Sequence, residues 1–148
     1  MKYFAYGSNM DRERMTKRGI CYSQRVHAIL KRHSLAFNKV ASRNPSEGKA
    51  NVVPDEEGIV EGALYEIRDS DLSKLDKHEG YPDHYDRLKM KVQLNEGQEE
   101  EAVLYVAQPY RTKEGLRPAR GYLNHLLAGR DILSEPYYRR LSSWQTLD

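Results

Sequence analysis

The chain has 148 residues, 24 of them basic and 22 acidic, which gives a formal net charge of +2 at neutral pH. Hydrophobic residues make up 39%, enough to bury the core of one domain, and we expect a single domain over residues 1–148. The near-balance of scattered charges gives no reason to expect a nucleic-acid partner. No apolar run is long enough to cross a bilayer, and the apolar stretch at residues 3–6 is too short for a signal peptide. We therefore expect a cytoplasmic protein without a membrane partner.

The first half of the chain is mainly strand-like. Residues 2–6 alternate and are aromatic-rich, and Asp11 can then cap a short helix that Gly19 ends. The composition of residues 39–49 predicts a loop. Further strands are expected at residues 20–30, 33–38 and 50–54 and, most clearly, at 58–67. Both faces of that last segment are largely apolar, which is typical of a central strand.

The second half mixes helices with one hairpin. Residues 84–95 and 101–107 flank a turn at 95–98 and predict two antiparallel strands. Helical patterns run over residues 69–79, from Pro118 to just before Gly129, and from Ser134 onward. Because strands and helices mix without a regular βαβ alternation, the pattern favours an α+β domain with a curved or barrel-like sheet.

Glu79 is the first candidate for chemistry. It shares a helical face with Leu72 and Leu75, at spacings i, i+3 and i+7, so we expect its carboxylate on the core-facing stripe. It also lies in the last helical turn, where the helix dipole presents negative charge. Both effects predict a raised pKa, which suits a general acid–base. The spacing alone equally allows an acid that points into water. The tight Gly80-Tyr81-Pro82 turn, with Tyr85 shortly after it, favours the buried interpretation.

The loop Tyr6-Gly7-Ser8-Asn9 is the second candidate. It joins a strand to a helix, and successive backbone N–H groups in such a turn can bind an anion. Phosphate-binding glycine motifs are absent, so a small carboxylate ligand fits better. Ser8 is not expected to be a nucleophile, because Met10 stands where a G-x-S-x-G elbow needs its second glycine.

Metal binding and thiol chemistry are not indicated. The five histidines show no close ligand spacing: His27, His33, His78, His84 and His125. We expect His78 to be exposed, because adjacent residues of a helix point in different directions. Cys21 lies in a strand-like run and is expected to be a small buried residue.

Taken together, these segments resemble the γ-glutamylcyclotransferase-like family, which includes the AIG2-like proteins. The opening Y-G-S-N signature at Tyr6–Asn9 and the L-D-x-x-E-G segment at Leu75–Gly80 carry most of the resemblance. Supporting matches follow the same order along the chain, at residues 50–54, 60–65, 85–87 and 102–105 and at Pro118, Tyr122, Gly129 and Tyr137. Residues 39–49 and the tail from about Tyr138 match nothing in the family pattern.

The resemblance implies a small mixed β-barrel with surrounding helices and an enzyme that needs no metal or organic cofactor. It implies that the amides of Gly7, Ser8 and Asn9 hold a γ-glutamyl group, that Glu79 is catalytic, and that Tyr85 and Tyr122 lie in the cavity. The reaction would be cyclisation of a small γ-glutamyl amine or peptide to 5-oxoproline.

Two other functions fit the same residues. The chain could be a small-ligand-binding or regulatory module that kept the cavity without the reaction. It could also carry out a related hydrolytic or biosynthetic step on another γ-glutamyl compound. The sequence leaves the leaving amine and the oligomeric state open.

Overall fold

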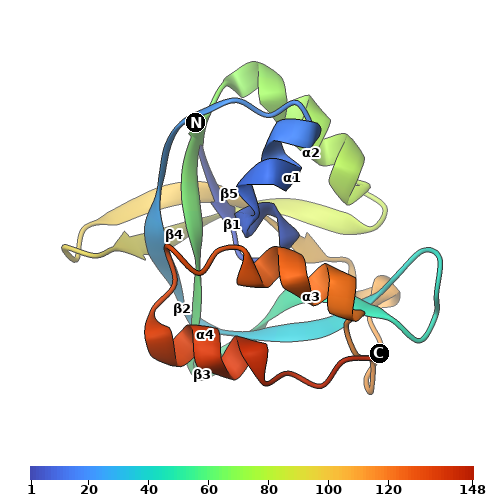
Figure 1. Ribbon diagram of the computed structural model, residues 1–148. Helices are drawn as coiled ribbons and strands as arrows, with labels where there is room; N and C mark the ends of the chain where they lie inside the picture. Colours follow the sequence, from blue (N-terminus) through green and yellow to red (C-terminus); the bar gives the residue numbers. More distant parts are fainter.

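A closed five-stranded barrel forms the centre of the computed structural model, which describes all 148 residues (Figure 1). The strands are β1 (Lys2–Ala5), β2 (Tyr22–Val40), β3 (Gly48–Ile67), β4 (Tyr85–Leu94) and β5 (Glu99–Ala107). They follow the order β1-β3-β2-β4-β5, and every neighbouring pair is antiparallel except β1 and β5. That parallel contact, between Tyr3 and Val103, closes the barrel. The predicted α+β mixed barrel is confirmed.

Four short helices surround the barrel: α1 (Arg12–Lys17), α2 (Leu72–Glu79), α3 (Arg120–Leu127) and α4 (Glu135–Ser142). Three single 3₁₀ turns accompany them: η1 (Ser8–Met10), η2 (Asp69–Asp71) and η3 (Pro109–Arg111). The expected cap at Asp11 is confirmed, since its side chain accepts a backbone N–H at the start of α1, and the side chain of Ser134 caps α4 in the same way. In Figure 1, α1 and α2 appear above the barrel and α3 and α4 across its front. None of the helices is long or apolar enough to span a membrane.

Strand lengths differ from the prediction. The segments 20–30 and 33–38 form one strand, β2, and the segments 50–54 and 58–67 form one strand, β3. Arg32, at φ 61°, sits in an irregularity of the β2–β3 ladder that bends the ribbon without ending it. Residues 54–57 are exposed and polar, so their composition resembles that of a loop. The predicted loop at 39–49 shrinks to residues 41–47, because pairing continues up to Val40 and Gly48.

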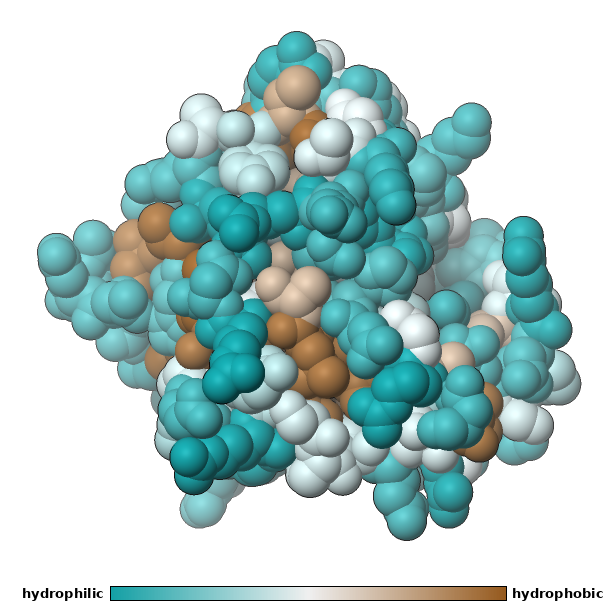
Figure 2. Space-filling model, viewed as in Figure 1, coloured by the Kyte–Doolittle hydropathy of each residue, from teal (hydrophilic) through white to brown (hydrophobic).

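The core fills the barrel and the space beneath α2. Its fully buried members include Phe4, Leu64, Leu75 and Leu104, from β1, β3, α2 and β5. On the face shown in Figure 2, hydrophobic atoms reach the surface only in small areas among hydrophilic ones. The expectation that Cys21 is buried is wrong: its backbone N–H donates to Asp71, and its side chain is left exposed just before β2 begins.

The starts of α2 and α3 were predicted two to three residues early. Residues 69–71 form the 3₁₀ turn η2, so α2 begins at Leu72. Ala119 is extended, so α3 begins at Arg120 rather than at Pro118. The end of α2 is as predicted, because Gly80 adopts the left-handed conformation that stops a helix.

Gly62 in β3 provides a test of the barrel packing. A Cβ there would lie 2.5 Å from the Ala5 carbonyl oxygen and 2.9 Å from the Phe4 ring. We expect Gly62→Ala to lower the free energy of unfolding by about 1–3 kcal/mol, measured by urea denaturation. The matched control is Gly121→Ala in α3, where no atom lies within 4 Å and the free energy should stay equal or rise by up to about 1 kcal/mol. Equal stability of the two variants would contradict this packing.

Candidate active site

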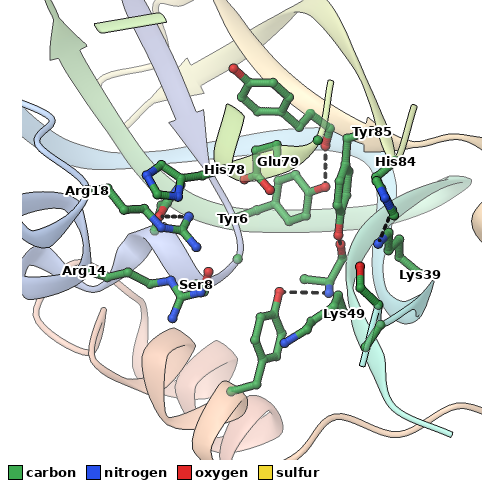
Figure 3. Close-up of a pocket in the computed structure, with 18 of the residues that line it drawn as sticks. Tyr6, Ser8, Arg14, Arg18, Lys39, Lys49, His78, Glu79, His84 and Tyr85 are labelled. Atoms are coloured by element: carbon green, nitrogen blue, oxygen red, sulfur yellow. Dashed lines mark hydrogen bonds between the residues drawn. The ribbon is translucent and has the colours of Figure 1, made fainter. Parts of the chain in front are cut away.

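One cavity of about 480 Å³ is lined by all seven candidate residues from the sequence: Tyr6, Gly7, Ser8, Asn9, Glu79, Tyr85 and Tyr122. The loop after β1 contributes the first four, the end of α2 contributes Glu79, the start of β4 contributes Tyr85 and α3 contributes Tyr122. Figure 3 shows these elements converging around the carboxylate. Segments far apart in the sequence therefore meet at a single site.

The loop after β1 presents backbone donors to this cavity. It continues into the 3₁₀ turn η1, in which Met10 N–H donates to the Gly7 carbonyl and Asp11 N–H donates to the Ser8 carbonyl. The first N–H groups of a helical turn have no acceptor within it, and none of the loop bonds uses the N–H groups of Gly7, Ser8 and Asn9 as a donor. Gly7 also lets the loop approach β3, since a Cβ there would lie 3.3 Å from the Ala50 Cβ.

The side chain of Asn9 bonds to the protein itself, so only its backbone N–H is left to face the cavity. The side chain is buried and bonded at both ends, since Nδ2 donates to the Tyr3 hydroxyl at 2.9 Å and Oδ1 accepts from Arg18 at 2.9 Å. Tyr65 donates to the Asn9 carbonyl at 2.7 Å. The side chain therefore holds the loop in place and positions Arg18.

The three site tyrosines form walls whose hydroxyl groups are already bonded. Tyr85 donates to the Ala50 carbonyl at 2.7 Å, and the Ala50 N–H donates to the Tyr122 hydroxyl at 3.0 Å. Tyr6 donates to the Tyr105 carbonyl. Burial raises the pKa of each of these tyrosines, so they remain neutral at physiological pH.

Glu79 is the last residue of α2, and Figure 3 shows its carboxylate directed into the cavity beside Tyr6. Leu75, one turn earlier on the same face, is fully buried, which confirms the predicted inward stripe. The carboxylate of Glu79 makes no ion pair or hydrogen bond within the protein. The side chain is partly exposed, and it lines the cavity. Burial raises its pKa, against the smaller opposing effects of Arg18, Arg14 and Lys39. The predicted direction of the pKa shift is confirmed, with burial as its cause.

Asp76 fastens α2 to the barrel and so positions Glu79. Its carboxylate accepts from Arg87 on β4 and from the Tyr105 hydroxyl on β5, the latter at 2.7 Å. Sequence reasoning gave Asp76 no role of its own, although it stands three residues before Glu79 in the L-D-x-x-E-G segment. Its position on the barrel-facing side of α2 is the signal that was available.

The strongest feature that sequence reasoning missed is the charge of the cavity. Six basic side chains line it, whereas Glu47 and Glu79 are its only acids. The six are Arg14, Arg18, Lys39, Arg43, Lys49 and Lys77. Arg14 lies on α1 and Arg18 directly follows that helix, four residues later, a spacing that was visible in the sequence. Lys39 and Lys49 come together only through the pairing of β2 with β3, which the sequence did not reveal.

The histidines near the cavity do not form a metal site. His78 is exposed at its rim, as predicted, and His84 accepts from the Lys39 ammonium at 2.9 Å through Nδ1. Nowhere in the chain do three histidine, cysteine, aspartate or glutamate side chains gather as metal ligands.

Comparison with known proteins gives a consistent family match. A sequence model of the family described as "Gamma-glutamyl cyclotransferase, AIG2-like" matches residues 3–124. A provisionally assigned gamma-glutamylcyclotransferase of Drosophila melanogaster is 35% identical over 60 residues, and one of Methanocaldococcus jannaschii is 43% identical over 44 residues. These matches cover 40% and 30% of this chain and only 38% and 37% of those two proteins.

Solved structures agree on the fold. An uncharacterized protein from Homo sapiens superposes with a TM-score of 0.86 at 25% identity, over 99% of this chain and 89% of that one. YkqA from Bacillus subtilis superposes with a TM-score of 0.84 at 26% identity, over 99% of this chain and 55% of that one. A structure titled gamma-glutamyl cyclotransferase gives 0.87 at 24% identity, over 100% and 89% of the two chains.

The raised pKa of Glu79 can be tested through stability. The fold favours the neutral carboxyl, so the stability that this group contributes is present below its ordinary pKa near 4.5 and is lost as pH rises through the folded pKa. Glu79→Gln mimics the neutral form at every pH. We therefore expect wild type to lose stability relative to Glu79→Gln as pH rises from about 4 to about 8.

Urea denaturation of both proteins across that pH range measures how the difference in their free energies of unfolding changes. Each unit between the pKa of Glu79 in the folded and in the unfolded state corresponds to about 1.4 kcal/mol of this change. Glu96→Gln, in the exposed turn between β4 and β5, is the matched control. A constant difference between wild type and Glu79→Gln would refute the raised pKa.

Proposed function

Since the chain belongs to the gamma-glutamyl cyclotransferase, AIG2-like family, we propose that it is a cyclotransferase: it converts the γ-glutamyl group of a small amine or peptide to 5-oxoproline and releases the amine. The observation that carries this proposal is the unpaired, partly desolvated carboxylate of Glu79 in the same cavity as the loop N–H groups of residues 7–9. A proton acceptor and a set of anion-binding donors are what an intramolecular acyl transfer requires.

In this reaction the α-amino nitrogen of the glutamyl group attacks the δ-carbonyl carbon of the same group. Glu79 accepts the proton that the α-ammonium group releases, and a new C–N bond closes the five-membered ring. Glu79 then passes that proton to the departing nitrogen as the original C–N bond breaks. The ring nitrogen still has two protons after the attack and gives up one of them by the same route. The lactam is therefore neutral, the amine leaves as an ammonium, and no net proton is consumed. Because nucleophile and carbonyl belong to one molecule, the main task of the site is to hold the substrate in its folded conformation.

The loop N–H groups and two nearby arginines would complement the negative charge of the substrate. The amides of Gly7, Ser8 and Asn9 would bind the α-carboxylate of the glutamyl group or the oxygen that becomes negative during attack. Arg14 on α1 and Arg18, just after that helix, also line the cavity and add positive charge there. Backbone donors fixed by a helical turn need no reorganisation as charge develops on the substrate.

The tyrosine walls favour cyclisation over hydrolysis. The hydroxyl groups of the three tyrosines already bond to backbone partners, so the rings offer the substrate mainly apolar surface. The three are Tyr6, Tyr85 and Tyr122. Apolar surface around the reacting carbonyl keeps water away from it. A water-activating enzyme would instead need a held water opposite the carbonyl.

A binding module on the same fold is the second candidate. It would need the loop amides but has no use for an unpaired buried carboxylate, which costs stability wherever it ionises. The unpaired carboxylate does not distinguish cyclisation from a biosynthetic step that removes a γ-glutamyl group, because both reactions would use Glu79. A cytoplasmic location, a small-molecule substrate and independence from cofactors remain predictions.

Replacing the carboxyl group of Glu79 tests the proposal. We expect Glu79→Gln to lower the rate of 5-oxoproline release by about 10²–10⁴-fold, the usual contribution of general acid–base catalysis. The assay uses a panel of γ-glutamyl amines, γ-glutamyl dipeptides and glutathione. In wild type, kcat/KM should fall as pH drops through the raised pKa of Glu79, since the protonated acid cannot accept the α-ammonium proton.

Glu96→Gln is again the control and should keep wild-type turnover. Full turnover by Glu79→Gln on every accepted substrate would exclude Glu79 as the acid–base group. Binding of 5-oxoproline by wild type without turnover of any panel member would instead favour the binding module.

Ser8→Ala distinguishes backbone binding from nucleophilic catalysis. If only the Ser8 N–H takes part, the variant keeps that group and should retain turnover within about 10-fold of wild type. Loss of a nucleophilic serine typically costs about 10⁶-fold. Measuring kcat for one good substrate decides between the two, and a near-complete loss in a folded variant would reassign Ser8 as the nucleophile.

A further inference from the structure

We propose that Arg25, on the first part of β2, is a positioning residue for the loop after β1. Together with Tyr65 on β3, it holds the loop carbonyls from behind, so that the N–H groups of Ser8 and Asn9 face the cavity. Neither Arg25 nor Tyr65 lines the cavity itself. The inference rests on the proposed function and adds to it residues that act on the substrate only through the loop. It comes from the bonds that the loop carbonyls accept, the geometry of the peptide unit and the burial of Arg25.

The four carbonyl groups of residues 7–10 all accept hydrogen bonds from within the protein, and the first two of these bonds close the η1 turn. The Gly7 carbonyl accepts from Met10 N–H at 3.1 Å, and the Ser8 carbonyl accepts from Asp11 N–H at 3.2 Å. In a trans peptide unit the C=O and the following N–H point in opposite directions. A carbonyl held on one side therefore turns the next N–H to the other side. These two bonds direct the N–H groups that follow them out of the turn, where they can bind an anion.

Arg25 holds the peptide unit that makes the second of these bonds. Its Nη2 donates to the Met10 carbonyl at 2.7 Å. That carbonyl shares its peptide unit with the Asp11 N–H, which donates to the Ser8 carbonyl. The Ser8 carbonyl in turn shares its peptide unit with the N–H of Asn9. Two peptide units in series thus connect the guanidinium to a donor in the cavity, and a cation at the far end polarises both in the direction that strengthens this donor.

Tyr65 supports the first bond of the turn in the same way. Its hydroxyl donates to the Asn9 carbonyl at 2.7 Å, and the same peptide unit contains the Met10 N–H that bonds to Gly7. Arg25 donates through Nε to this hydroxyl at 3.2 Å. A hydroxyl has one proton to donate, so the bond that it accepts from Arg25 leaves that proton for the Asn9 carbonyl. The guanidinium therefore supports both bonds of the turn, one directly and one through Tyr65.

The surroundings of Arg25 fit this role. Its side chain is only 5% exposed, and a buried guanidinium needs partners for its charge and its donors. Nη1 has such a partner in Asp131, at 2.7 Å, in the segment after α3. Asp131 is 47% exposed, so this third bond lies at the surface while the other two point inward to the loop. Three partners in three directions use the planar, forked shape of arginine, which a lysine ammonium reproduces only in part.

The first test measures the affinity of Arg25 variants for 5-oxoproline by titration calorimetry, at a temperature where each variant is fully folded. We expect Arg25→Met to weaken binding by about 10- to 100-fold, the range of one charge-assisted hydrogen bond. Arg25→Lys keeps the charge and a donor for the Met10 carbonyl, so it should recover part of the loss. Asp131→Asn is the control. It removes the charge of the surface partner and leaves both inner bonds in place, so it should bind like wild type.

Amide hydrogen exchange, followed by NMR on the ligand-free protein, separates positioning from a general loss of stability. The N–H groups of Met10 and Asp11 should exchange about 10-fold faster or more in Arg25→Met, relative to the slowest-exchanging amides of β3. A purely structural role would speed the β3 amides as much and leave this ratio unchanged. Asp131→Asn should keep the wild-type ratio.

Three results would overturn the inference: wild-type affinity of folded Arg25→Met for 5-oxoproline, an equal loss of affinity in Asp131→Asn, or an unchanged exchange ratio in Arg25→Met. The exchange measurement needs no ligand, so it also separates this inference from the proposed function. If wild type neither binds nor releases 5-oxoproline, the cyclotransferase reaction is refuted, and the exchange ratio alone decides whether Arg25 positions the loop.

Discussion

The site is held together by hydrogen bonds to one short piece of β3. Tyr85 on β4 and Tyr122 on α3 both bond to the backbone of Ala50, one to its carbonyl and the other to its N–H. Asn51 adds a third connection, since its side-chain oxygen accepts from Ala107 N–H on β5 at 2.9 Å. Buried backbone groups must find partners, and here those partners are also the walls of the cavity. The shape of the site is thus fixed by the same bonds that join β3 to its surroundings.

This arrangement explains how an unpaired carboxylate is tolerated. Asp76 ties α2 to β4 and β5, which holds the end of the helix with Glu79 facing the cavity. The basic side chains around the cavity are close enough to favour its ionised form, although burial has the larger effect on its pKa. A chain with a net charge of only +2 therefore builds a strongly positive cavity by directing a few of its 24 basic residues inward.

Local patterns predicted the parts of the structure that depend on neighbouring residues. The capping of α1 by Asp11, the stop of α2 at Gly80 and the inward face of Glu79 follow from helical spacing and chain stereochemistry. Long-range pairing was not predictable in the same way. The continuous strands β2 and β3 cross polar, exposed stretches that resemble loops, and only the formed ladder places Lys39 beside Lys49. The backbone of Cys21 likewise bonds to Asp71, fifty residues away, a contact that the strand-like local pattern could not reveal.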